Sequence, residues 1–167
     1  MDALASHAGR ERRLEILKDP HAGAFAVMGC ALYLLVTFGL WTEYAFAPRT
    51  AGVLALGFLL SRSLSGLSVL AFPRARREGL AVAFADSSDA AVQAVLLLWV
   101  FACAFGMLRL DLAAGGACLA AAVAVFLYYK WSVCRSFGGV TGDLAGYFLQ
   151  LCELGMLAAV VSLGVIK

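Results

Sequence analysis

The chain of 167 residues is 63% hydrophobic and only 14% charged, with a formal net charge of +2. Soluble domains are about 45–50% apolar and about 25% charged, and a chain of this size cannot bury so much apolar surface in one core. The composition therefore excludes an ordinary soluble domain and predicts a protein that sits in a lipid bilayer. Its basic residues are not interleaved with aromatic residues, so we expect no nucleic acid among its partners.

The first 21 residues are polar and predict an amphipathic segment outside the bilayer. Over residues 6–18, charged side chains surround a few apolar ones, a pattern that indicates a short helix. Pro20 cannot continue that helix and is expected to end it.

Five apolar segments follow, each close to the ~20 residues that a helix needs to cross the hydrocarbon of a bilayer. Arg62 interrupts the second segment and Glu153 the fifth. The connection at 109–111 is so short that the third and fourth segments must pair as an antiparallel hairpin. The sequence thus predicts one all-α domain, a polytopic membrane bundle of about five transmembrane helices with a short N-terminal helix. The predicted spans are 22–41, 51–72, 90–108, 112–129 and 144–166.

The distribution of basic residues predicts the orientation. With five spans, the N-terminal segment and the loops 73–89 and 130–143 share one side of the membrane, and this side carries most of the lysines and arginines. Because positively charged flanking segments stay in the cytoplasm, we expect that side to be cytoplasmic.

The loop before the fifth span carries the most informative pattern. Gly138, Gly139 and Gly142, with the hydroxyl of Thr141, lead directly into the carboxylate of Asp143. A lipid-embedded helix needs neither that flexibility nor that charge. A site where the backbone approaches a phosphate or a metal ion needs both.

A pair of carboxylates in the N-terminal segment is the next candidate. Glu15 and Asp19 are four residues apart, on one helix face, with Lys18 beside them. Their repulsion costs about 0.2–0.5 kcal/mol in an isolated helix, and a bound divalent cation would remove it. Mg²⁺ suits such oxygen ligands together with phosphates. A solvated helix with mutually neutralising charges is the alternative, and the spacing alone favours it.

Two sets of charged residues leave alternatives open. Arg62 and Glu153 are costly inside a membrane, so they are expected to face the bundle interior as neighbours. They form either a structural ion pair or an arginine aimed at phosphate in a polar cavity. Arg74, Arg76 and Arg77 either anchor the chain on anionic lipid headgroups or bind a polyphosphate substrate.

Several runs of this chain resemble the cobalamin synthase family, whose members are adenosylcobinamide-GDP ribazoletransferases. Their order and spacing fit along nearly the whole chain, and Glu153 follows the last of them. The runs are ERRLEILKD at 11–19, GAF at 23–25, LSRSLSG at 60–66, FPRARREGL at 72–80 and GGVTGD at 138–143.

The resemblance implies an enzyme of the late corrinoid pathway, a multi-pass protein of the bacterial inner membrane with a cytoplasmic active face. It would transfer the adenosylcobinamide phosphate of adenosylcobinamide-GDP to α-ribazole, or to its 5′-phosphate, and release GMP. Family members depend on Mg²⁺, which would bridge the pyrophosphate of the donor.

The same resemblance yields the candidate site residues. The metal ligands would be Asp2, Glu15, Asp19 and Asp143. The catalytic candidates are Asp143, Asp19 and Glu15. The substrate and phosphate binders would be Lys18, Arg62, Arg76, Arg77, Gly138, Gly139, Thr141 and Gly142.

The chain departs from the family pattern at its start. Members carry an Asp-rich motif before the region of Glu15, and Asp2 would be the last carboxylate of that motif here. We therefore expect that the start is misassigned, that the chain is a fragment, or that the first part is a separate chain. The expected partner is the missing N-terminal part or a second copy of this chain. If the missing aspartates bind the metal, this chain alone would be inactive.

Two other functions stay open at this point. One is a related Mg²⁺-dependent membrane transferase that moves a phospho-alcohol from a nucleotide diphosphate donor. The other is a non-enzymatic membrane subunit or transporter fragment, in which Arg62 and Glu153 form a structural or ion-path pair.

Overall fold

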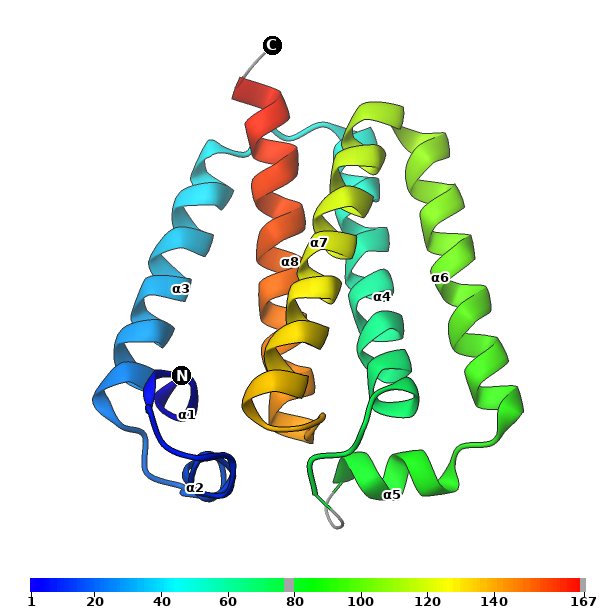
Figure 1. Ribbon diagram of the computed structural model, residues 1–167. Helices are drawn as coiled ribbons and strands as arrows, with labels where there is room; N and C mark the ends of the chain where they lie inside the picture. The colour runs from blue at the N-terminus through cyan, green and yellow to red at the C-terminus, as the bar shows by residue number, and fades with distance from the viewer. Residues whose placement is uncertain (77–79, 166–167) are drawn as a thin grey trace.

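The structure, a computed structural model, describes residues 1–76 and 80–165. Within these ranges there is no β-strand, only an isolated β-bridge. Five long helices form a bundle, and three short helices lie at one end of it (Figure 1). The long helices are α3 (Ala24–Glu43), α4 (Pro48–Ala71), α6 (Ala90–Leu110), α7 (Leu112–Ser136) and α8 (Gly142–Val165). The short helices are α1 (Asp2–Ala5), α2 (Arg10–Ile16) and α5 (Leu80–Ser87).

All five long helices are long and apolar enough to cross a membrane, so the predicted fold class is confirmed. The expected hairpin is also present, because α6 and α7 run antiparallel and only Asp111 separates them (Figure 1). The Asp111 carboxylate accepts a hydrogen bond from the Ala114 N–H at 2.9 Å and caps α7. Helix α7 extends about two turns past residue 129, because Lys130 and Arg135 end the apolar run without ending the helix.

The N-terminal segment differs from its prediction. One helix was expected over 6–18, but the structure has α1 and α2 on either side of a break at residues 6–9. Ser6 is extended, with ψ of 132°, and Gly9 caps α2 in an extended conformation. Helix α2 ends at Ile16, one turn before Pro20. The sequence also gave no sign of α5, which lies within the loop expected at 73–89.

The core lies among α4, α6, α7 and α8, where small residues let the helices approach closely. Cys118 and Ala122 of α7 are fully buried there, and a Cβ at Gly115 would collide with the backbone of Met107 on α6. Helix α3 stands at the edge of the bundle beside α8 (Figure 1), and none of its residues is buried. Lipid is therefore the natural neighbour of most of α3.

One end of the bundle carries α1, α2, α5 and the loop between α7 and α8, and is called the polar end below (Figure 1). A short β-bridge ties two of its segments together. The Ala75 N–H donates to the Val140 carbonyl at 3.1 Å, and the Val140 N–H donates to the Pro73 carbonyl at 2.8 Å. Segments that the five-span topology predicted to share one side are therefore joined directly.

The two glycines before Val140 make this bridge possible. Gly138 adopts φ of +70° at the end of α7, and the Gly139 N–H returns to the Val133 carbonyl at 3.3 Å, the pattern of a glycine C-cap. Gly139 has φ of +154°, and a Cβ there would overlap the Pro73 carbonyl and lie 2.7 Å from the Ala75 nitrogen. Both positions therefore need glycine for packing.

Substituting Gly139→Ala is expected to lower the free energy of unfolding by about 2 kcal/mol, because the added methyl group pushes the bridged segments apart. Gly142→Ala is the matched control, since nothing lies within 4 Å of a Cβ at that position. Thermal unfolding in detergent measures both variants. Equal melting temperatures for the two would contradict the packing role of Gly139.

Candidate functional site

A basic cavity of about 400 Å³ opens at the polar end. Arg74 and Asp86 form an ion pair across it, with Nη1 and Oδ1 2.6 Å apart. Arg76 donates from Nη2 to the Leu14 carbonyl at 2.6 Å and so connects the segment after α4 to α2. The cavity is lined by Arg10, Arg74, Ala75, Arg76, Val82 and Asp86.

The glycine-rich loop lies against this cavity, but two of its glycines are covered. The Arg10 side chain lies where a Cβ of Gly138 would be, and Gly139 packs on the Pro73 segment. The Gly139 N–H is also occupied by the cap of α7. Phosphate binding by these two glycines stays a prediction, and the structure gives each of them a packing role.

The exposed part of the loop is the start of α8. Thr141 is buried, and its Oγ1 accepts a hydrogen bond from the Leu144 N–H at 3.4 Å, which caps the helix. Gly142 has open space around it, and the exposed Asp143 carboxylate has no hydrogen-bond or ion-pair partner among the described residues. The first turn of a helix attracts anions through its N–H groups. Asp143 stands at that position with its oxygens free for a ligand.

The other predicted acidic ligands have partners within their own segment or at the next helix. Both carboxylate oxygens of Asp2 cap α3, accepting from the Gly23 and Ala26 N–H groups at 2.9 Å each. Glu15 pairs with Arg12 at 2.8 Å on the exposed face of α2. These contacts account for the positions of the Asp2 and Glu15 carboxylates without a metal ion.

Asp19 lies in the turn after α2. It accepts hydrogen bonds from the His21 N–H at 2.9 Å and contacts the ring Nδ1 at 2.8 Å. These hydrogen bonds, the backbone one foremost, lower the pKa of the Asp19 carboxyl below its ordinary value. Lys18, also predicted as a phosphate binder, is exposed and has no side-chain partner within the described part of the chain.

The four predicted metal ligands do not form one site. No three histidine, cysteine or carboxylate side chains among the described residues lie close enough to hold a metal ion between them. Magnesium is usually bound by one or two carboxylates plus substrate phosphates, with waters completing its shell. A single free carboxylate such as Asp143 fits that mode, whereas a four-carboxylate cage does not fit this chain.

Arg62 and Glu153 are neighbours, as the sequence predicted, but only Glu153 faces the bundle interior, because the Arg62 side chain is 57% exposed. Arg62 Nη1 lies 2.7 Å from Glu153 Oε1, and the Ser61 hydroxyl donates to the same oxygen at 2.9 Å. Arg62 Nη1 also donates to the Phe58 carbonyl at 2.8 Å. Arg62 lies about 14 Å along α4 from its end at Ala71. These contacts favour the structural ion pair over a phosphate ligand.

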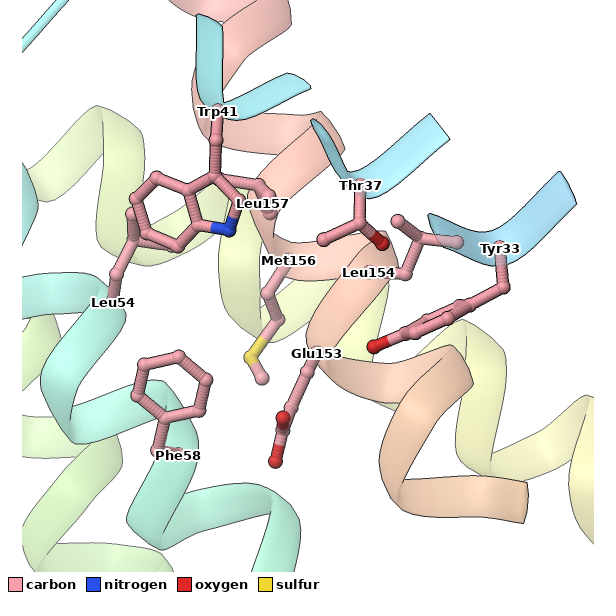
Figure 2. Close-up of a pocket in the computed structure, with 9 residues that line it drawn as sticks. All are labelled: Tyr33, Thr37, Trp41, Leu54, Phe58, Glu153, Leu154, Met156 and Leu157. Atoms are coloured by element: carbon pink, nitrogen blue, oxygen red, sulfur yellow. The ribbon is translucent and has the colours of Figure 1, made fainter. Parts of the chain in front are cut away.

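Glu153 also borders a small cavity of about 60 Å³ between α3, α4 and α8. Figure 2 shows its carboxylate beside Phe58 and Met156, with Tyr33, Thr37 and Trp41 of α3 along the other side. This cavity lies within the spans and is separate from the arginines of the polar end.

Sequence reasoning located Arg74 and Arg76 but not the other charged side chains of the cavity. Arg77, predicted beside Arg76, lies outside the described residues. Arg10 and Asp86 line the cavity and were not singled out. No local sequence pattern marks these two residues. Arg10 packs against Gly138, which is far from it in the sequence, and Asp86 lies on a helix that was not predicted.

Replacing Glu153→Ala is expected to lower the free energy of unfolding by about 2 to 3 kcal/mol, since it leaves an unpaired arginine within a membrane span. The double variant Arg62→Leu with Glu153→Ala should recover most of that loss, because it removes both charges. Thermal melting in detergent tests the pair. A double variant as unstable as the single one would contradict the ion-pair role.

Comparison with known proteins connects this geometry to a family. The family model described as "Cobalamin-5-phosphate synthase" matches residues 1–161. A protein of Lachnoclostridium phytofermentans named adenosylcobinamide-GDP ribazoletransferase is 39% identical, over 99% of this chain and 64% of that protein. A protein of the same name from Pseudomonas paraeruginosa is 38% identical, over 90% of this chain and 59% of that protein. The chain thus spans less than two thirds of the length of these relatives. No solved structure matches it with significance. The resemblance expected from the sequence is confirmed, and the chain belongs to the cobalamin-5-phosphate synthase family.

Proposed function

We propose that this chain acts as an adenosylcobinamide-GDP ribazoletransferase in cobalamin biosynthesis. It would transfer the adenosylcobinamide phosphate group from adenosylcobinamide-GDP to α-ribazole, or to its 5′-phosphate, and release GMP. One observation carries the proposal. The runs that resemble the family at 11–19, 72–80 and 138–143 are far apart in the sequence, yet their described residues meet at the polar end.

The chemistry of the proposed reaction suits this end of the molecule. A free ribose hydroxyl oxygen of the acceptor forms a bond to the phosphorus that bears the cobinamide, while the bond from that phosphorus to the bridging oxygen of GMP breaks. GMP leaves with the bridging oxygen, and the hydroxyl loses its proton to a base. Arginines stabilise the charge on the phosphate oxygens, and little other chemistry is required of the protein.

Asp143 is the proposed base. It is exposed at the polar end and has no partner among the described residues, whereas Glu15 and Asp19 already accept hydrogen bonds from Arg12 and His21. The guanidinium groups of Arg74 and Arg76 line the neighbouring cavity and supply donors for phosphate oxygens.

We also propose that Mg²⁺ binds together with the substrate, held by Asp143 and the donor's phosphate oxygens. When bound, it would neutralise charge on the pyrophosphate. Chelation of Mg²⁺ should then abolish GMP release from a membrane preparation, and added Mg²⁺ should restore it. Full activity in excess chelator would remove the metal from the proposal.

The proposed setting is the bacterial cytoplasmic membrane, with the polar end in the cytoplasm. The positive charge of that end supports this orientation. We propose that the additional length of the relatives, or a second copy of the chain, acts with this chain as a partner. Release of GMP from adenosylcobinamide-GDP and α-ribazole tests the activity, both with this chain and with an upstream in-frame extension. No release from either inserted form would refute the function.

Asp143→Asn should reduce turnover by about 10³-fold or more while leaving the melting temperature within a degree or two, because the exposed side chain has no hydrogen-bond or ion-pair partner among the described residues. Glu43→Gln makes the same charge change at the opposite end of the bundle and serves as the control. Initial rates of GMP release measure both variants. An Asp143→Asn enzyme as active as the control would exclude Asp143 as the base.

A further inference from the structure

The cavity at the polar end contains a guanidinium group that the proposed reaction did not use. Arg10 is exposed on the first turn of α2, and its guanidinium group occupies the space that a Cβ of Gly138, at the end of α7, would fill. Only a residue without a Cβ leaves that space, so the loop is built to receive Arg10. Arg10 has no hydrogen-bond or ion-pair partner among the described residues.

Arg76 presents a second group that still needs a partner. Its Nη2 holds the Leu14 carbonyl, which fixes the side chain, while its Nε is buried without a hydrogen-bond partner among the described residues. A buried N–H donor without an acceptor costs about 1–3 kcal/mol. A ligand oxygen that reaches this N–H would remove that penalty.

The third arginine, Arg74, is paired with Asp86, the one carboxylate among the described residues that line the cavity. Arg74 pairs with Asp86 at 2.6 Å, and both side chains are about half exposed. Among the described residues that line the cavity, three guanidinium groups and one carboxylate give a formal charge of +2. An entering anion would compete with Asp86 for Arg74, because both offer oxygens to the same donor.

We propose that Arg10, Arg74 and Arg76 form one pocket for the diphosphate of a nucleotide, in which Asp86 occupies Arg74 until the ligand displaces it. The size, the charge and the planar donors of the pocket match two adjacent phosphate groups. The inference rests on the proposed function for the identity of the donor substrate. It adds Arg10 as a binding residue and Asp86 as a competitor that sets the affinity.

Binding of inorganic pyrophosphate and of GDP to the full chain, held in nanodiscs of zwitterionic lipid, tests the pocket without turnover. Arg10→Ala should raise the dissociation constant about tenfold through loss of a charge-assisted contact. Arg12→Ala is the matched control, because Arg12 lies on the same helix and pairs with the exposed Glu15. It should leave binding within about twofold. Equal weakening by both variants would show a diffuse charge effect and overturn the pocket.

Asp86→Asn gives a result of opposite sign. It frees Arg74 and removes a negative charge, so pyrophosphate should bind about three- to fivefold more tightly. Weaker binding would show that Asp86 supports the site and would overturn the competition. If Arg10→Ala fails to insert, Gly138→Ala provides the second test, because the added methyl group displaces the Arg10 side chain. Unchanged binding in a folded Gly138→Ala chain would refute the role of Arg10.

The phosphate group could come from a nucleotide or from a lipid headgroup. A second set of nanodiscs containing anionic phospholipid separates them. Weaker GDP binding in the anionic discs, dependent on Arg10, would show that headgroups enter the same pocket, and unchanged GDP binding would assign the pocket to the nucleotide. Loss of GMP release with pyrophosphate binding intact would count against the proposed function alone, whereas turnover without Arg10-dependent binding would count against the pocket alone.

Discussion

The absence of hydrogen-bonding partners in lipid decides how this chain is built. Backbone groups inside the bilayer must be satisfied within each helix, so the five long helices run without interruption, and non-helical backbone is confined to their ends. Positive φ angles occur, within the described residues, only at Gly138 and Gly139, at the end of α7. The same constraint gathers exposed charge at the ends of the helices, and topology then decides which charges meet. Five crossings place the N-terminal segment, the segment after α4 and the α7–α8 loop together.

The glycine-rich loop joins these segments through packing. Phosphate binding by this loop would need free backbone N–H groups. The Gly139 N–H instead closes the cap of α7, and the Val140 N–H donates to the Pro73 carbonyl. The glycines are needed because other parts of the chain occupy the space of their side chains: the Arg10 guanidinium at Gly138 and the Pro73–Ala75 backbone at Gly139. The loop therefore serves a binding site indirectly, by allowing arginines from distant segments to converge.

Prediction from the sequence succeeded where the signal is local or is forced by the bilayer. Apolar length marks the five spans, and the high energy of charges in lipid predicted that Arg62 and Glu153 would be neighbours. It failed where a contact depends on tertiary structure. The capping of α3 by Asp2 is one such contact, since it forms only after the chain turns back at residues 17–23, and metal binding by Asp2 stays a prediction. The spacing of residues along a helix does not show which carboxylates find partners. It therefore could not predict that Glu15 pairs with Arg12 while Asp143 has no partner among the described residues.

The two arginine sites differ in a way that separates structure from function. Arg62 has its charge neutralised by Glu153, and its Nη1 also donates to Ser61 and to the Phe58 carbonyl, so the charges of that site are balanced within the protein. Among the described residues, the pocket at the polar end has three guanidinium groups against one carboxylate, and a buried Arg76 donor has no acceptor. A site whose charges and donors are satisfied contributes to stability, whereas an unbalanced one favours binding of an anion. The imbalance at Arg10, Arg74 and Arg76, more than the number of arginines, is therefore the physical reason to assign phosphate binding to this end.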